Sequence, residues 1–297
     1  MTLTQTGTIE IPGAKGSSFD HAAFDPNTRR IFVAHTGRDS IEVIDHDSGN
    51  HIATLPGFQG AAGVVAENGQ VLVTNRGAAT LTSLDAQTLT ARAVFHTGKH
   101  PNGVAIVAKK DLAVVASIGD DGRGAKLEVF NADGRHRAID LPGRPRWCVT
   151  DRAGERVFLA IRDPSMVLAA RLPDLTGIEH WTLPVDGAHG LDIDHESGRL
   201  YVACDDRALV QVDIGSGAAT NQWPLAGAPD VTFFNPVTRR VHVATGEPGV
   251  IDSIDPRTGH CERTATGAGA HTTALVAPDR LYVFSPTHGG ALAFKGA

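Results

Sequence analysis

Apolar and polar positions follow one pattern that recurs seven times along the chain. In each copy a short apolar run leads through a turn into a second run, as at residues 30–34, 199–203, 240–244 and 280–284. A third run often follows, as at residues 40–45. Short runs rich in β-branched residues and bounded by turn residues are typical of strands. No segment combines helical periodicity with capping residues, so the pattern predicts almost no helix.

The repeat has a nearly constant length. Equivalent positions at the start of the first run are separated by 41, 41, 44, 43, 41 and 41 residues. These positions, called anchors below, are Asp20, Ala61, Asn102, Arg146, His189, Asp230 and His271. A period of about 40–45 residues that holds four short strands is typical of propeller blades. The sequence therefore predicts an all-β fold, a seven-bladed β-propeller with four antiparallel strands per blade.

We expect one domain over residues 1–297. The predicted blades cover residues 17–57, 58–98, 99–143, 144–185, 186–227, 228–269 and 270–297. The last repeat supplies only three strands. We expect an N-terminal strand at residues 7–12 to join the last blade, because closing the ring in this way removes a free strand edge.

Several segments resemble a known repeat. Residues 98–106 (Gly-Lys-His-Pro-Asn-Gly-Val-Ala-Ile) and 71–75 (Val-Leu-Val-Thr-Asn) look like the YVTN-type propeller repeat. Over nearly its whole length the chain is similar to YncE-like seven-bladed propellers, and it resembles virginiamycin B lyase-like and gluconolactonase-like propellers more weakly. The resemblance implies the fold. It leaves function open, because such families include enzymes, binders and scaffolds.

Composition narrows the classes of partner. The net charge of −6 disfavours a nucleic-acid or anionic membrane surface. No apolar stretch is long enough to span a bilayer, and the N-terminus lacks the features of a signal peptide. The three cysteines are far apart, so we expect no disulfide framework and a cytoplasmic location. No dinucleotide or phosphate-loop motif occurs, so we expect no nucleotide or flavin cofactor.

The anchors carry the candidate chemistry. In a propeller, the starts of the inner strands meet at one mouth of the central channel, where binding sites are common. Five of the seven anchors are ionisable, and together they provide acid, base and anion-binding groups. The predicted catalytic residues are Asp20, His21, Arg146, His189, Asp230 and His271.

Neighbouring positions are expected to surround this mouth. The predicted substrate-binding residues are His35, Asn75, Arg76, His100, Asn102, Trp147, Arg162, Asp205 and His288. Each is also typical of a structural role: Asp and Asn cap turns, a single histidine is often a hydrogen-bonded structural residue, and Arg or Trp can pack at a rim. Their joint occurrence at equivalent positions favours a functional site.

Two classes of function fit this pattern. The first is a hydrolase or lyase acting on a small polar or anionic substrate, with Arg146 binding an anion and Asp20 or Asp230 acting as base or orienting an imidazole. In a metal-dependent form, His21, His189 and His271 would hold one divalent transition metal, because three imidazoles with an open position suit such an ion. The alternative is a non-catalytic ligand-binding or protein-interaction scaffold. The lack of a signal peptide disfavours a surface-layer role.

Overall fold

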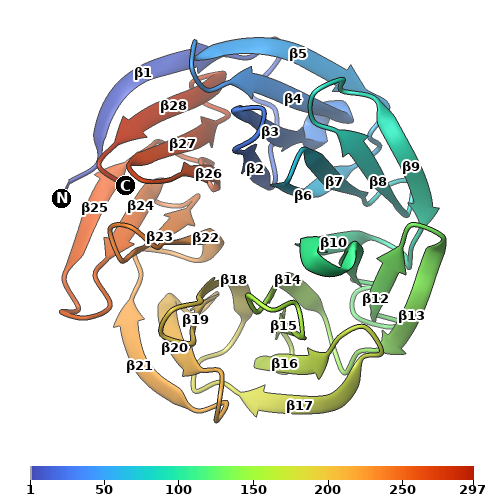
Figure 1. Ribbon diagram of the computed structural model, residues 1–297. Helices are drawn as coiled ribbons and strands as arrows, with labels where there is room; N and C mark the ends of the chain where they lie inside the picture. The colour runs from blue at the N-terminus through green and yellow to red at the C-terminus, as the bar shows by residue number, and fades with distance from the viewer. Residues whose placement is uncertain (1) are drawn as a thin grey trace.

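Seven four-stranded antiparallel sheets form a ring around a common axis (Figure 1). The computed structural model describes residues 2–297. Its only helices in that range are the short 3-10 turns η1 (Thr36–Arg38) and η2 (Ala108–Lys110). The predicted seven-bladed β-propeller is confirmed, as is the near absence of helix.

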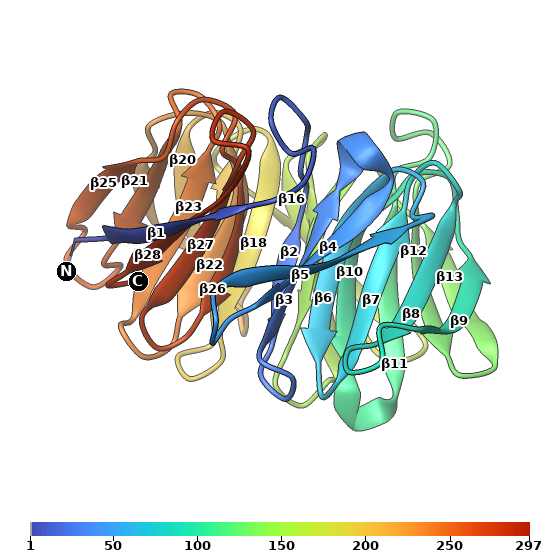
Figure 2. The same ribbon diagram turned by 90° about the horizontal axis from the view of Figure 1, so that it is seen from above.

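Each blade runs in chain order from the axis outward. Blade one contains β2 (Ala22–Asp25), β3 (Arg30–His35), β4 (Ser40–Asp45) and β5 (Asn50–Pro56); blade two β6 (Ala61–Glu67), β7 (Gln70–Asn75), β8 (Thr80–Asp85) and β9 (Ala91–His96); blade three β10 (Pro101–Val107), β11 (Leu112–Ser117), β12 (Lys126–Asn131) and β13 (Gly134–Asp140). Blade four contains β14 (Pro145–Thr150), β15 (Arg156–Ile161), β16 (Met166–Arg171) and β17 (Thr176–Thr182); blade five β18 (Ala188–Asp194), β19 (Arg199–Cys204), β20 (Ala208–Asp213) and β21 (Ala219–Pro224); blade six β22 (Pro229–Asn235), β23 (Arg240–Thr245), β24 (Val250–Ile254) and β25 (Cys261–Ala265). The sheets twist strongly, so the outer strands β1 and β5 cross the steep inner strands at a large angle (Figure 2).

The N-terminal strand closes the ring. Blade seven consists of β26 (Thr272–Val276), β27 (Arg280–Ser285) and β28 (Gly290–Lys295), and β1 (Thr4–Glu10) pairs with β28 at its outer edge. The observed strand starts three residues before the predicted 7–12 segment. Pairing with the full length of β28, from Lys295 opposite Thr4 to Gly290 opposite Glu10, sets these bounds.

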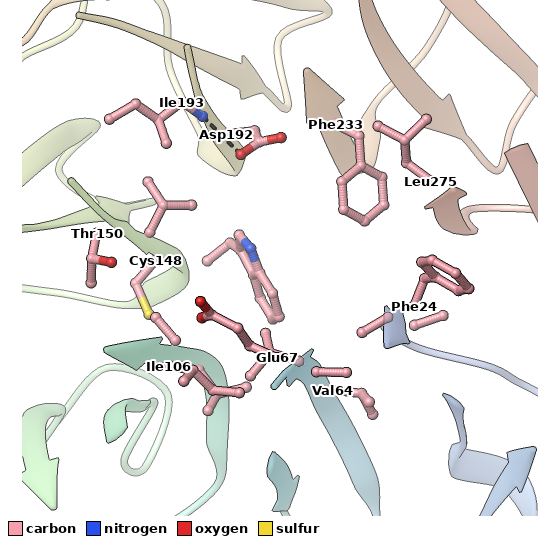
Figure 3. A pocket seen from close by; sticks show the side chains of 18 of the residues that line it. Phe24, Val64, Glu67, Ile106, Cys148, Thr150, Asp192, Ile193, Phe233 and Leu275 are labelled. Atoms are coloured by element: carbon pink, nitrogen blue, oxygen red, sulfur yellow. Dashed lines mark hydrogen bonds between the residues drawn. The ribbon is translucent and has the colours of Figure 1, made fainter. Parts of the chain in front are cut away.

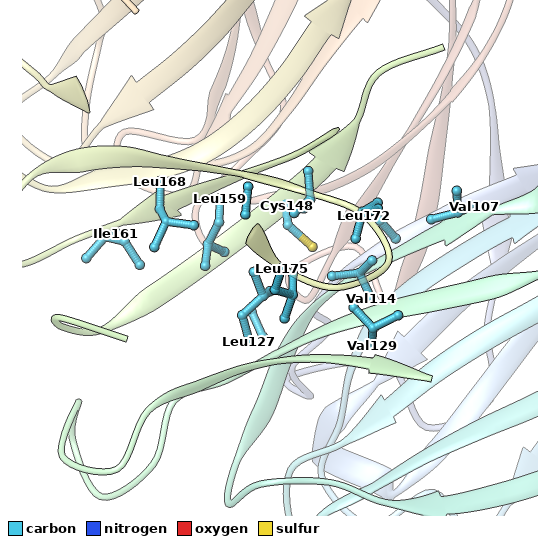
Figure 4. Packing of buried hydrophobic residues seen from close by; sticks show 14 residues of the cluster. Val107, Val114, Leu127, Val129, Cys148, Leu159, Ile161, Leu168, Leu172 and Leu175 are labelled. Carbon is cyan, nitrogen blue, oxygen red and sulfur yellow. The ribbon is translucent and has the colours of Figure 1, made fainter. Parts of the chain in front are cut away.

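The blades are held together by apolar faces. Between blades three and four, Val114, Leu127 and Val129 face Leu159 and Leu168, and all five side chains are buried (Figure 4). Because each blade lies between two neighbours, its middle strands are buried on both faces and read as continuous apolar runs. The outer strands alternate between half-buried and exposed positions, as β5 does.

Candidate functional site

β-Bulges shape the starts of the inner strands. Where β14, β18 and β22 pair with the next strand, the register shifts between Pro145 and Cys148, between Ala188 and Leu191, and between Pro229 and Thr232. A bulge bends a strand and re-aims its side chains. The anchors Arg146, His189 and Asp230 lie inside these bulges.

Neighbouring bulges also lie in close contact. A Cβ on Gly190 would lie 2.3 Å from the carbonyl oxygen of Asp230 in the next blade, so only glycine fits there. This approach brings the anchors of successive blades together.

One group of mouth residues is centred on Asp20. Its carboxylate lies 2.5 Å from Nδ1 of His21 and 2.8 Å from a guanidinium nitrogen of Arg76. The same nitrogen of Arg76 donates to Oδ1 of Asn102. Burial raises the pKa of Asp20, but the charge of Arg76 and the contact with His21 outweigh it and lower the pKa overall. Asp20 is therefore a buried, ionised carboxylate.

A second group is centred on Asp230. One oxygen of Asp230 lies 2.7 Å from Nδ1 of His271, and the other lies 3.5 Å from Nε2 of His189. Nδ1 of His189 pairs with Asp205 at 2.7 Å, and Asp205 accepts a hydrogen bond from Nε of Arg162 at 2.7 Å. The structure thus orders His271, Asp230, His189, Asp205 and Arg162 into one chain of contacts across blades four to seven.

Within this chain of contacts, the carboxylates and imidazoles stabilise each other's charged forms. Burial opposes ionisation at each of its buried members. The two imidazoles nevertheless hold the pKa of Asp230 well below its usual value. In turn, Asp205 and Asp230 raise the pKa of His189 above its usual value, and Asp230 raises that of His271. The two histidines are therefore more readily protonated than a free imidazole, and they lie against carboxylates whose pKa is lowered.

The two groups are neighbours. The negative charge of Asp230 partly offsets the lowering of the pKa of Asp20, and the charge of Asp20 contributes to the raised pKa of His271. Blades one and seven therefore bring the first and last anchors into one electrostatic cluster. All six predicted catalytic residues belong to this mouth region.

A cavity of about 270 Å³ adjoins the cluster, and Arg76, His100, Arg144 and Arg146 line it. Arg144 is paired with Asp121 at 2.7 Å. Arg146 forms no ion pair within residues 2–297, and its buried Nε has no hydrogen-bond partner there. Burial lowers the pKa of Arg146, and the neighbouring charge of Arg144 lowers it further, while Asp230 and Asp205 act in the opposite direction. The cavity wall thus carries a guanidinium without a carboxylate partner.

Trp147 links the mouth to the channel below it. Its indole stacks on the imidazole of His21, with ring centroids 3.8 Å apart and planes inclined by 5°. Trp147 also lines a second cavity, of about 320 Å³, to which all seven inner strands contribute (Figure 3). Trp147 therefore contacts the mouth cluster and borders the lower channel at the same time.

Three predicted substrate-binding residues lie away from the cluster. His35 has no exposed surface and pairs with Glu42 at 2.7 Å inside blade one. Asn75 is buried and donates to Thr80 and Thr82 within blade two. His288 hydrogen-bonds Ser285 at 2.9 Å in its own loop. The structure brings none of the three into the contacts at the mouth, and their role in substrate binding stays a prediction.

Sequence reasoning missed residues at both ends of the channel. Arg144 lies two residues before its anchor, the position that His100 holds in blade three, so the repeat contained the signal. Asp192 follows His189 by three residues, as Val149 follows Arg146 and Phe233 follows Asp230. Asp192 is thus a carboxylate at a position where other blades have apolar residues, and this difference could have marked it as a candidate functional residue.

The three histidines predicted as metal ligands do not form an evident metal site. In residues 2–297, no group of three or more His, Cys, Asp or Glu side chains is placed to hold a metal ion. Nδ1 of His21, His189 and His271 each faces a different carboxylate. The side chains of the described residues therefore do not fit a metal ion at this mouth.

Comparisons with known proteins support the fold and no more. No protein-family model matches the sequence, and no curated protein matches it. Among solved structures, the chain is similar to one titled Kuenenia stuttgartiensis Hydrazine Synthase, with a TM-score of 0.82 and 12% identity, covering 99% of this chain and 97% of that chain. At this identity the likeness shows the propeller fold alone. Neither short helix in the described range is long and apolar enough to cross a membrane.

Proposed function

We propose that this chain is an enzyme that binds a small anionic substrate at the channel mouth and hydrolyses it or eliminates a group from it. One observation carries the proposal. Two imidazoles flank the carboxylate of Asp230, and beside them Arg146 presents a guanidinium without a carboxylate partner. Acid–base groups and an anion-binding group thus meet in one place.

The arginines would hold the substrate. A guanidinium binds a carboxylate or phosphate through two parallel hydrogen bonds, and such bonds are stronger when partly shielded from water. Arg146 and Arg144 lie on the wall of the same cavity, with Arg76 completing it. Arg146 has no ion pair in the described chain that a ligand must first break. The arginines can therefore bind two negatively charged oxygens of a small substrate.

The histidines would move the proton. Asp205 fixes His189 by a hydrogen bond to Nδ1, and a carboxylate oxygen of Asp230 lies 2.7 Å from Nδ1 of His271. The side chain of His271 is 32% exposed against 16% for His189, so His271 is the more accessible proton donor. In this scheme His271 protonates the leaving group, and Asp230 stabilises the imidazolium before transfer.

Cysteine does not act as a nucleophile in this scheme. Cys204 immediately precedes Asp205, but it is fully buried and burial raises its pKa to about 12. A thiol with so high a pKa is not a thiolate near neutrality. A water molecule activated at the mouth, or direct elimination, remains consistent with the residues present.

A non-catalytic anion binder is the second candidate, because the cavity lined by arginines would serve binding alone. Membership of the YVTN or YncE-like propellers also stays a proposal. It rests on the repeat motifs at residues 71–75 and 98–106.

The two candidates are separated by measuring binding and turnover in the same variants. Titration calorimetry with inorganic phosphate and succinate should show binding that Arg146→Gln weakens about tenfold or more. The matched control is Arg257→Gln, which removes an 83% exposed arginine from an outer turn. Turnover is then screened with phosphate monoesters, carboxylate esters and β-hydroxy acids.

For a substrate found in this way, His271→Asn should keep anion binding and lower turnover about a hundredfold. Wild-type turnover in both His271→Asn and His189→Asn would overturn the catalytic scheme. Anion binding without turnover of any of these substrates would favour the binder.

A further inference from the structure

The lower half of the channel contains a chamber that the mouth chemistry does not use. Its volume of about 320 Å³ is that of a small-ligand site. Figure 3 shows Phe24, Ile106, Phe233 and Leu275 projecting into it from different blades. Most of the residues that line it have apolar side chains, and the polar ones among them are Glu67, Thr150, Asp192 and His195.

Two carboxyl groups, those of Asp192 and Glu67, belong to the lining of this chamber (Figure 3). Asp192 accepts one backbone hydrogen bond on each oxygen, from Ile193 at 2.8 Å and from Phe234 at 2.7 Å, and it forms no ion pair in the described chain. Glu67, the last residue of β6, lines the same chamber and makes no hydrogen bond or ion pair there. Neither carboxylate forms an ion pair in the described chain, so no paired cation neutralises either of them at the chamber wall.

Aromatic faces complete the chamber. One face of the Trp147 indole is covered by His21, while Trp147 also borders the chamber. Phe24 and Phe233 contribute further rings. Rings of this kind attract a positively charged ligand through their negative faces, and the attraction is stronger where water is excluded.

The chamber continues toward the end of the channel opposite the mouth cluster. Glu67, Ile106, Thr150 and His195 line both the chamber and an adjoining cavity of about 260 Å³. The adjoining cavity also carries Lys109, Asp151 and Arg152, which are of mixed charge. A ligand therefore has a route to Asp192 that does not pass the mouth histidines.

We propose that this chamber binds a small organic amine, with its ammonium group between Asp192 and Glu67 and its apolar body against Trp147, Phe24 and Phe233. The ammonium would supply the missing cation for both carboxylates. The apolar body would fill the space between the rings. This site is separate from the anion site at the mouth, and the two proposals stand or fall independently.

The protonation states agree with this assignment. Burial raises the pKa of Asp192 to about 7 and raises that of Glu67. Burial and Arg152 lower the pKa of His195, so that side chain is less readily protonated than a free imidazole and competes less as a cation. An ammonium ion binds the ionised carboxyl, so its affinity should rise between about pH 6 and about pH 8.

The test uses phenethylamine and its neutral isostere 2-phenylethanol, titrated into the full chain by calorimetry at about pH 8. We expect phenethylamine to bind with one site per chain and 2-phenylethanol to bind at least about tenfold more weakly. Asp192→Asn should weaken amine binding about tenfold or more, and Glu67→Gln should weaken it severalfold. The matched control Asp133→Asn removes an exposed carboxylate from the turn between β12 and β13 and should change nothing.

Three results would overturn the proposal. They are equal binding of the alcohol and the amine, unchanged amine affinity in Asp192→Asn and Glu67→Gln, and no amine binding to the folded wild-type chain. Glu67 is exposed at the chamber edge, so Glu67→Gln gives a folded variant if Asp192→Asn does not. Arg146→Gln separates the two sites, because it should weaken phosphate binding and leave phenethylamine binding unchanged.

Discussion

The imidazole of His21 lies flat against the indole of Trp147, with ring centroids 3.8 Å apart and an angle of 5° between the planes. His21 belongs to the polar mouth through Asp20, whereas Trp147 borders the apolar chamber. This single contact joins blades one and four, which are not adjacent in the ring. The stacked pair therefore lies between the charged mouth cluster and the chamber.

Removing the indole should destabilise the fold. Trp147→Ala leaves a void between the mouth and the chamber, and we expect it to lower the free energy of unfolding by about 3 kcal/mol. Trp147→Phe keeps an aromatic face over His21 and should cost about 1 kcal/mol. Urea unfolding at neutral pH measures both. Equal stability of the alanine variant and the wild type would mean that the stack contributes nothing.

The mouth ion pairs should stabilise the protein within a defined pH window. The pKa of Asp230 is lowered from 3.8, so its contribution is present above that value and is lost as the pH falls. The pKa values of His189 and His271 are raised from 6.5, so their contribution is present below 6.5 and is lost as the pH rises through the folded values.

Asp230→Asn should therefore lower stability most between pH 3.8 and 6.5, by about 2 kcal/mol. Urea unfolding across a pH series measures the difference from wild type. Asp133→Asn, with its carboxylate in an exposed turn, is the control. A difference that does not vary with pH would show that Asp230 contributes through shape and not through charge.

The fold could be predicted because the repeat is a property of local sequence. Strand runs and turns recur at a fixed period, and a blade cannot bury its two faces without neighbours. The first residues of β1 were harder to predict from the sequence. Thr4 to Thr6 are exposed polar residues, and only their pairing with β28 includes them in the strand.

The candidate site could be predicted as a set of positions but not as a set of contacts. Equivalent anchors must meet at one mouth, so the neighbourhood of Asp20, Asp230 and His271 follows from the period. Which imidazole faces which carboxylate depends on bulges and on rotation between blades. Burial of His35 depends in part on its stacking against Phe19, a contact that the sequence of its own strand does not encode.

Elemental analysis tests the prediction that His21, His189 and His271 bind one divalent transition metal. Because Nδ1 of His21, His189 and His271 each faces its own carboxylate, we expect chain purified without chelator to hold well below about 0.1 equivalents of zinc, manganese, iron, copper or nickel. About one equivalent of metal that disappears in a His189→Ala, His271→Ala double variant would restore the metal site.

Blade one contains a buried carboxylate that should matter for stability alone. Glu42 has no exposed surface and accepts hydrogen bonds from His35, Ser40, His51 and Thr54. Burial raises its pKa, but these bonds outweigh burial and lower the pKa from 4.5 to about 2. Its contribution is therefore present above pH 4.5 and is lost as the pH falls toward 2.

Glu42→Gln should cost about 3 kcal/mol at neutral pH and progressively less below pH 4.5. Thermal unfolding at several pH values measures this, with Glu10→Gln on the exposed face of β1 as the control. His35→Ala should likewise lower stability without changing phosphate binding at the mouth. Loss of phosphate binding in a folded His35→Ala variant would instead support the role predicted from the sequence.

Asp192 should have the opposite effect on stability. Its pKa is raised from 3.8 to about 7, so the folded chain holds a proton that the unfolded chain releases, and stability falls as the pH rises between these values. Asparagine resembles the protonated acid. Asp192→Asn should therefore match wild type near pH 3.8 and exceed its stability by up to about 4 kcal/mol above pH 7.

Urea unfolding near pH 4 and pH 8 measures the two limits, with Asp133→Asn as the control. Lower stability of the variant at both limits would show that the bonds from Ile193 and Phe234 need a carboxylate. A gain confined to alkaline pH, together with lost amine binding, would identify Asp192 as a residue kept for binding at the expense of stability.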